Sequence, residues 1–127
     1  MLELRNLKVE FKLPNSKQLV HAVNDVSLTV PKGTSLGLVG ESGSGKSTVA
    51  RAVMQLVTLQ RGNISVNGRK ILFSDRDSLR FLRRNVQMVF QDPHSALNPR
   101  LNILRIISEP LVIHANFRRS ELKDRVV

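Results

Sequence analysis

Alternating apolar and polar positions predict two strands at the start of the chain. Residues 2–13 alternate around Leu7, Val9 and Phe11, and residues 20–30 alternate in the same way. A period of two is typical of strands that bury one face. A Pro-Asn-Ser sequence between the two runs favours a turn. The first predicted unit is therefore an antiparallel pair of strands.

A different apolar pattern follows. Residues 34–39 include the run Ser-Leu-Gly-Leu-Val, which predicts a buried strand. After a glycine-rich segment, apolar residues recur at helical spacing and predict a helix from Lys46 to about Leu59. The apolar positions of this helix are Val49, Val53, Leu56 and Val57. A strand, a glycine-rich turn and a helix are thus predicted in immediate succession.

The middle of the chain predicts a hairpin, a helix and a further strand. Residues 63–66 form a short strand pattern, and the Asn67-Gly68 pair after them is the strongest short hairpin signal of the sequence. Residues 77–84 have a basic helical pattern. The apolar run 86–90 then predicts a strand.

The last third of the chain begins with a predicted loop. Two prolines keep residues 92–99 from forming a helix. Helical spacing resumes at Ile103, is interrupted at Pro110 and starts again near Ser120. With 127 residues, of which 41% are hydrophobic, the chain is one α/β domain at most and can build a core.

The glycine-rich segment carries the most specific chemistry. Its nine residues fit the phosphate-binding pattern G-x-x-x-x-G-K-[ST], between a predicted strand and a predicted helix. They are Gly40, Glu41, Ser42, Gly43, Ser44, Gly45, Lys46, Ser47 and Thr48. The glycines let successive backbone N–H groups face phosphate oxygens, and the helix adds the positive end of its dipole. The alternative is a flexible turn without a ligand, but the flanking strand and helix favour a nucleoside triphosphate site.

Two side chains of this loop have distinct expected roles. Lys46 supplies a mobile cation for the β- and γ-phosphates. The Ser47 hydroxyl is placed to ligate Mg²⁺, which needs only one or two protein oxygens beside phosphate. Glu41 is not expected to be catalytic, because a carboxylate beside the γ-phosphate would repel it.

Charge and cysteine content bear on nucleic-acid binding and on cellular location. The net charge of +10 raises nucleic-acid binding as an alternative, and four arginines crowd residues 76–84. The chain has no Tyr or Trp to act as stacking platforms, so a solvated basic face is the preferred interpretation. There is no cysteine, no apolar run near the about 20 residues that span a bilayer, and no signal-peptide pattern. A cytoplasmic location is expected.

Three features resemble the front half of the ATP-binding subunit of an ATP-binding-cassette (ABC) transporter. They are the phosphate loop with its flanks, the stretch 86–93 that contains Gln91, and the opening pair of strands with Phe11. The loop 91–100 is similar to that of oligopeptide and dipeptide importers, with nickel and glutathione importers as near relatives. With residues 40–51 it resembles the second of that group's two paired ATPase subunits.

The resemblance implies a P-loop NTPase fold with an N-terminal antiparallel β-subdomain, and ATP and Mg²⁺ as ligands. It implies that Phe11 stacks on adenine, although an inward packing residue of its strand is the alternative. It implies that Gln91 reaches the Mg²⁺ and the attacking water. The implied partners are membrane-spanning subunits, a second ATP-binding subunit and, indirectly, a substrate-binding protein, at the cytoplasmic face of the inner membrane and without nucleic acid.

Relatives in that family continue into a signature loop, an acidic Asp-Glu strand and a histidine. None of these three motifs is found among residues 1–127. Residues 1–127 are therefore interpreted as the N-terminal part of one nucleotide-binding domain. We expect these residues alone not to hydrolyse ATP and to be marginally stable. Two alternatives to a transport ATPase remain open: a nucleotide-binding remnant without turnover, and a soluble relative that acts on nucleic acid or ribosomes.

Overall fold

The computed structural model describes residues 1–127 except 15, 17, 93–96, 116–125 and 127. The chain divides into two compact units, Met1–Met88 and Val89–Val127, and each is described by itself.

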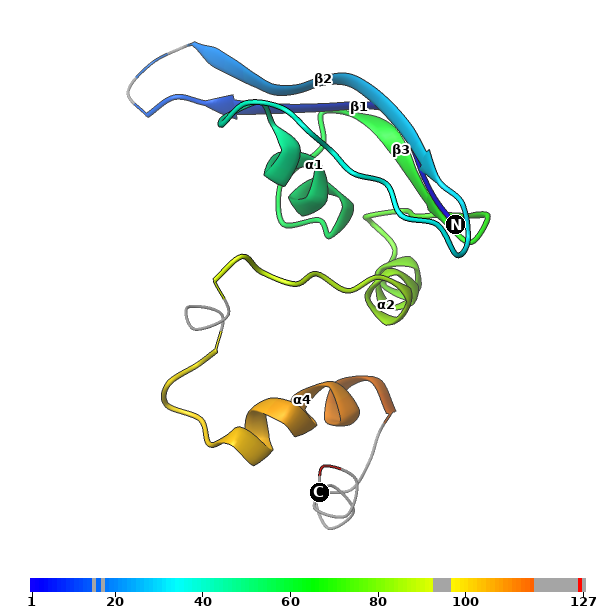
Figure 1. The fold of residues 1–127 in the computed structure, drawn as a ribbon, viewed down its shortest axis with the longest axis vertical. Coiled ribbons are helices and arrows are strands. Elements are labelled where there is room, and N and C mark those ends of the chain that lie inside the picture. Colours follow the sequence, from blue (N-terminus) through cyan, green and yellow to red (C-terminus); the bar gives the residue numbers. More distant parts are fainter. Residues whose placement is uncertain (15, 17, 93–96, 116–125, 127) are drawn as a thin grey trace. The chain divides into compact units, whose positions relative to one another are not determined.

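The first unit is built on an antiparallel sheet (Figure 1). Its strands are β1 (Leu2–Lys12), β2 (Leu19–Val30), β3 (Arg61–Val66) and β4 (Arg69–Lys70). They lie in the order β2-β1-β3-β4, so the first two strands of the chain pair directly. The predicted opening pair and the predicted strand before the Asn-Gly turn are confirmed.

The turn between β3 and β4 is a two-residue hairpin turn. Asn67 and Gly68 both have positive φ, +51° and +79°, which is the conformation that such a tight turn requires. The Asn67 N–H donates to the Met1 carbonyl oxygen at 2.8 Å, and the terminal amine of Met1 donates to Asn67 Oδ1 at 2.9 Å. The hairpin signal in the sequence is therefore confirmed, and the turn also fixes the N-terminus.

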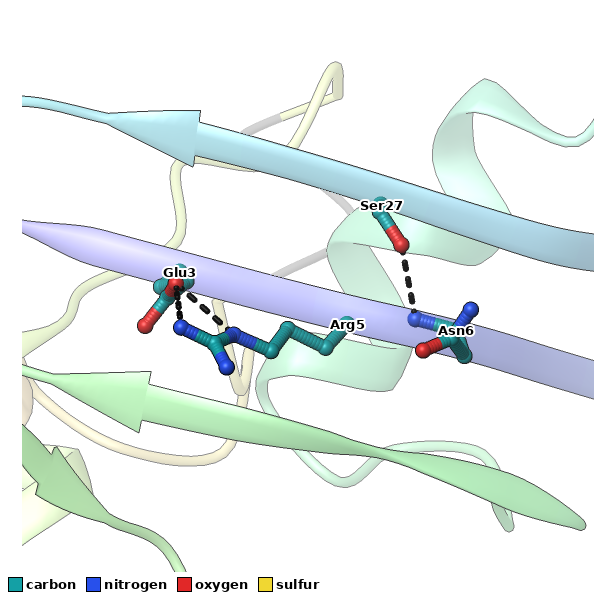
Figure 2. A network of polar contacts seen from close by, with 4 residues as sticks. All are labelled: Glu3, Arg5, Asn6 and Ser27. Carbon is teal, nitrogen blue, oxygen red and sulfur yellow. Dashed lines mark hydrogen bonds and ion pairs between the residues drawn. The ribbon is translucent and has the colours of Figure 1, made fainter.

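Strand β1 is irregular around Asn6, where its pairing shifts against both neighbours. Asn6 has a φ of +50°, and its N–H donates to Ser27 Oγ at 2.8 Å, while Arg5 pairs with Glu3 (Figure 2). Opposite this bulge lies Gly62, where a Cβ would stand 2.8 Å from the Asn6 carbonyl oxygen. The bulge therefore needs a glycine on β3 because the backbones approach too closely for a side chain.

Two helices complete the first unit, α1 (Lys46–Val53) and α2 (Arg76–Asn85). They share one hydrophobic core with the sheet, formed by Leu4, Leu7, Val9, Val23, Val49, Ala52, Val53, Ile64, Val66, Ile71 and Leu82. Helix α1 ends earlier than predicted, since Gln55 adopts a φ of +58° and the N–H of Leu56 bonds back to the Arg51 carbonyl oxygen at 2.8 Å. This pattern is a Schellman motif, which stops the helix before Leu59.

The strands predicted at residues 34–39 and 86–90 are not present, and those two predictions are wrong for this structure. A strand forms only when a neighbour accepts its hydrogen bonds, and the sheet of the described residues contains only β1 to β4. The apolar residues of the first segment are left exposed, with Val39 at 98%. An apolar run therefore predicts a segment that can form a strand, but the strand forms only beside a hydrogen-bonding partner.

The second unit contains α4 (Ile103–Ala115), which runs through Pro110. The predicted interruption at this proline is therefore wrong, although the proline removes one backbone hydrogen bond from the helix. The helix predicted near Ser120 lies outside the described residues. Among the described residues, no helix has the length and hydropathy to cross a membrane.

Candidate phosphate-binding site

The loop 40–45 leads directly into α1, as the motif requires (Figure 1). Gly43 and Gly45 have φ values of +81° and +90°, a left-handed conformation that side chains disfavour. Gly45 is the N-cap of α1, and the first helical bond runs from the Val49 N–H to its carbonyl oxygen at 2.9 Å. Two glycines therefore turn the chain so that the helix begins at Lys46.

A contact with β2 fixes the end of the loop. The register of β1 and β2 shifts between the pairs Val9↔Val23 and Glu10↔His21, which leaves Ala22 as an extra residue. A Cβ on Gly45 would stand 2.2 Å from the Ala22 carbonyl oxygen. The bulge thus brings the sheet backbone against the loop so closely that only glycine fits. Sequence reasoning missed Ala22, because nothing in its residue type indicates a bulge.

The Lys46 side chain folds back over the loop. Its Nζ donates to the Gly40 carbonyl oxygen at 2.8 Å, to the Glu41 carbonyl oxygen at 2.5 Å and to Ser44 Oγ at 3.1 Å. Among the described residues, these acceptors of the ammonium group are all neutral oxygens. The ammonium group remains a positive charge that a phosphate oxygen would attract more strongly than these acceptors do.

The start of α1 offers backbone donors. No side chain of the described residues caps this helix, so the amide groups of its first turn remain directed out of the helix end. Ser47 and Thr48 lie in that turn, and Ser47 is exposed. Amide donors at a helix N-terminus favour an anion, and phosphate is the anion that the motif indicates.

The residues present fit Mg²⁺ only in the company of phosphate. The described residues contain no group of three or more His, Cys, Asp or Glu side chains that could hold a metal ion. The exposed Ser47 hydroxyl is a single hard oxygen ligand, which suits a cation that keeps its waters and takes phosphate oxygens.

Phe11 lies near the end of β1 and pairs with Val20 of β2, two residues before Ala22. Its side chain is 41% exposed and is not part of the core cluster. Phe11 is thus partly exposed in this structure, and its stacking on adenine stays a prediction. Strand β2 contacts Phe11 at Val20 and Gly45 at Ala22. The exposed ring of Phe11 therefore belongs to the same unit as the phosphate loop.

A charged cluster adjoins Phe11. Glu10 Oε1 accepts from Lys8 Nζ at 2.9 Å and from His21 Nδ1 at 2.8 Å. The hydrogen bond from Lys8, together with the charges of Lys8 and His21, lowers the pKa of Glu10 below its usual value, although partial desolvation opposes this. The cluster ties the bulged part of β2 to β1 across the Glu10↔His21 pair.

This lowered pKa predicts a pH-dependent contribution to stability. A carboxyl group with a lowered pKa stabilises the fold above its unfolded-state pKa, and that contribution disappears as the pH falls through the folded-state pKa. We expect Glu10→Gln to lower the melting temperature at about pH 7 and to make little difference at about pH 3. Melting curves of both proteins at the two pH values measure this. A difference that is equally large in acid would contradict the assignment.

Gln91 belongs to the second unit, whereas the phosphate loop belongs to the first, and each unit is described by itself. Gln91 is exposed and lies at the end of the apolar run that lacks a strand. Its expected contact with Mg²⁺ and water stays a prediction. Half of the loop 92–99 that follows, residues 93–96, lies outside the described residues.

Comparison with known proteins places residues 23–126 in the family described as ABC transporter. One curated relative is the oligopeptide transport ATP-binding protein OppF of Escherichia coli (strain K12), 42% identical, with 99% of this chain and 40% of that protein covered. Another is the glutathione import ATP-binding protein GsiA of Pectobacterium atrosepticum, also 42% identical, with 99% of this chain and 21% of that protein covered. The chain thus spans less than half of either relative.

A solved structure has the same fold. It is the dimeric post-hydrolysis state of the ATP-binding cassette MJ0796 bound to ADP and Pi, with a TM-score of 0.79 and 26% identity. The match covers 98% of this chain and 53% of that one. The predicted α/β P-loop fold with an antiparallel N-terminal sheet is therefore confirmed.

Proposed function

This chain belongs to the ABC transporter family, and from that premise we propose that it binds ATP as part of the ATP-binding subunit of an importer. The proposed cargo is peptides or a related small solute, since the relatives named above import oligopeptides and glutathione. One observation supports the ATP site above all: Lys46 Nζ lies over the glycine-rich loop, and this loop leads directly into the N-terminus of α1.

The residues of the loop divide the binding between them. The first-turn amides of α1 and the loop backbone would donate to the phosphate oxygens, and Lys46 would exchange its carbonyl partners for the β- and γ-phosphates. The Ser47 hydroxyl would hold Mg²⁺. When bound, Mg²⁺ neutralises charge on the phosphates. Phe11 would receive the adenine ring on its exposed face.

Hydrolysis is proposed for the whole subunit. Gln91 would orient the attacking water in that protein, and Lys46 would stabilise the charge that develops on the transferred phosphate. The acidic strand expected from the family resemblance is not among residues 1–127. ATP binding is therefore the part of the activity that is proposed for residues 1–127, which span 40% of OppF.

The proposed assembly follows from the same premise. A second ATP-binding subunit would face the loop, which is in keeping with the dimeric neighbour structure. Membrane-spanning subunits would receive the conformational change, and a substrate-binding protein would deliver cargo to them. The proposed location is the cytoplasmic face of the cell membrane, attached peripherally and without nucleic acid.

The adenine site is tested at Phe11. We expect Phe11→Ala to weaken ATP binding by about 10-fold, because base stacking on an aromatic ring contributes about 1–3 kcal/mol. Phe11→Tyr retains the ring and should bind as the wild type does, whereas Phe11→Leu retains only apolar bulk. Calorimetric titration with ATP and with inorganic triphosphate separates the base from the phosphates. Equal losses for both ligands would contradict stacking at this position.

A further inference from the structure

Four arginines share the outward face of α2. They are Arg76, Arg80, Arg83 and Arg84. At about 100° per residue, these positions fall within an arc of about 100° on the helix surface. The buried residues of the helix, Ser78 and Leu82, lie on the opposite side. The only carboxylate within α2 is Asp77, so the face has a strong excess of positive charge.

The orientation of this face is fixed by the packing of α2. Leu82 is fully buried in the core, and Ser78 Oγ accepts from the Leu72 N–H at 3.1 Å. Asp75 caps the helix by accepting from the N–H groups of Asp77 and Ser78. These contacts hold the apolar side inward, and all four arginines are exposed.

The contacts of Arg69 and Arg80 leave most of the positive charge of this surface in place. The guanidinium carbon of Arg69 lies 4.8 Å from the centre of the Phe81 ring, which extends the basic surface to the β3–β4 hairpin. Arg80 and Asp77 approach to 3.8 Å, but their side chains are 66% and 80% exposed. An ion pair this exposed is weak and leaves the arginine available to another anion.

We propose that the arginine face of α2 docks on the anionic phospholipid headgroups of the membrane at which the protein works, an inference that rests on the proposed function. Guanidinium groups bind phosphate in bidentate geometry, and a rigid helix presents several of them in one direction. The cytoplasmic leaflet carries anionic lipids that attract such clusters. Nucleic acid fits less well, because the aromatic ring of α2, Phe81, lies under Arg69 and is not offered for stacking.

The test is co-sedimentation with vesicles of phosphatidylcholine, with and without about 30% phosphatidylglycerol. We expect binding only to the anionic vesicles. Each basic residue near the surface contributes about fivefold to the partition coefficient, so Arg76→Gln, Arg80→Gln and Arg83→Gln together should reduce it by about 100-fold. The corresponding Lys variants should retain binding because they retain the charge.

A matched control removes the same charge elsewhere. The replacements Lys12→Gln, Lys32→Gln and Arg61→Gln affect exposed residues outside α2 and should leave vesicle binding nearly unchanged. An equal loss in this control, or no binding by the wild type, would overturn the proposal. So would an affinity for duplex DNA that depends on the α2 arginines while vesicle binding does not. ATP binding measured on the same samples keeps a failure of the lipid surface distinct from a failure of the nucleotide site.

Discussion

Replacing Lys46 with Ala is expected to reduce ATP affinity by about 100-fold or more, which corresponds to about 3 kcal/mol. Lys46 Nζ lies over the loop, where its partners in the described part of the chain are carbonyl and hydroxyl oxygens, so they leave its charge available to the phosphates. Its removal also leaves the first-turn amides of α1 to hold the phosphates without the ammonium group. Calorimetric titration with ATP and Mg²⁺ measures the change.

The matched control is Lys70→Ala, which removes an exposed lysine from β4. It carries the same loss of charge and should bind ATP as the wild type does. Circular dichroism should show that both variants retain the sheet, because Lys46 does not contribute to the core cluster. Undiminished ATP binding by Lys46→Ala would exclude this loop as the phosphate site.

Replacing Gly45 with Ala is expected to lower the free energy of unfolding by about 3 kcal/mol and to displace the phosphate loop. Two effects add together. The φ of +90° is strained for any residue with a side chain, and the new Cβ would lie 2.2 Å from the Ala22 carbonyl oxygen. Because that oxygen belongs to the backbone of β2, it cannot rotate away. Urea unfolding and ATP titration measure the two consequences.

Gly43→Ala serves as the control, since it separates backbone strain from the clash. Gly43 has a similar φ of +81°, but a Cβ there meets no atom within 4 Å. Its expected cost is only about 1 kcal/mol, with the loop still in place. If the two variants proved equally destabilised, the contact between the loop and the bulge of β2 would have no energetic importance.

Much of the local structure could be predicted from residue patterns. The period-two alternation located β1 and β2, and the Asn67-Gly68 pair located a hairpin turn whose residues both need positive φ. The basic pattern at residues 77–84 located α2 to within one residue at each end. These signals work because each depends on contacts between residues close in sequence or on the burial of one face.

The predictions that failed depend on partners distant in sequence. The apolar runs at residues 34–39 and 86–90 read as strands, but hydrogen-bonded neighbours decide whether a strand forms. The end of α1 depends on the positive φ of Gln55, a residue type with no strong preference for it. Pro110 lies inside α4 although proline usually interrupts a helix.

The sequence by itself determined where the candidate phosphate loop lies, because the spacing of its glycines, lysine and serine within one short segment defines the motif. Only the tertiary structure decided what holds that loop: a bulge at Ala22 of β2, which depends on the register between two strands, presses a carbonyl oxygen against Gly45. It also decided that Phe11 is exposed and that the arginines of α2 point outward, because burial is a property of the packed core.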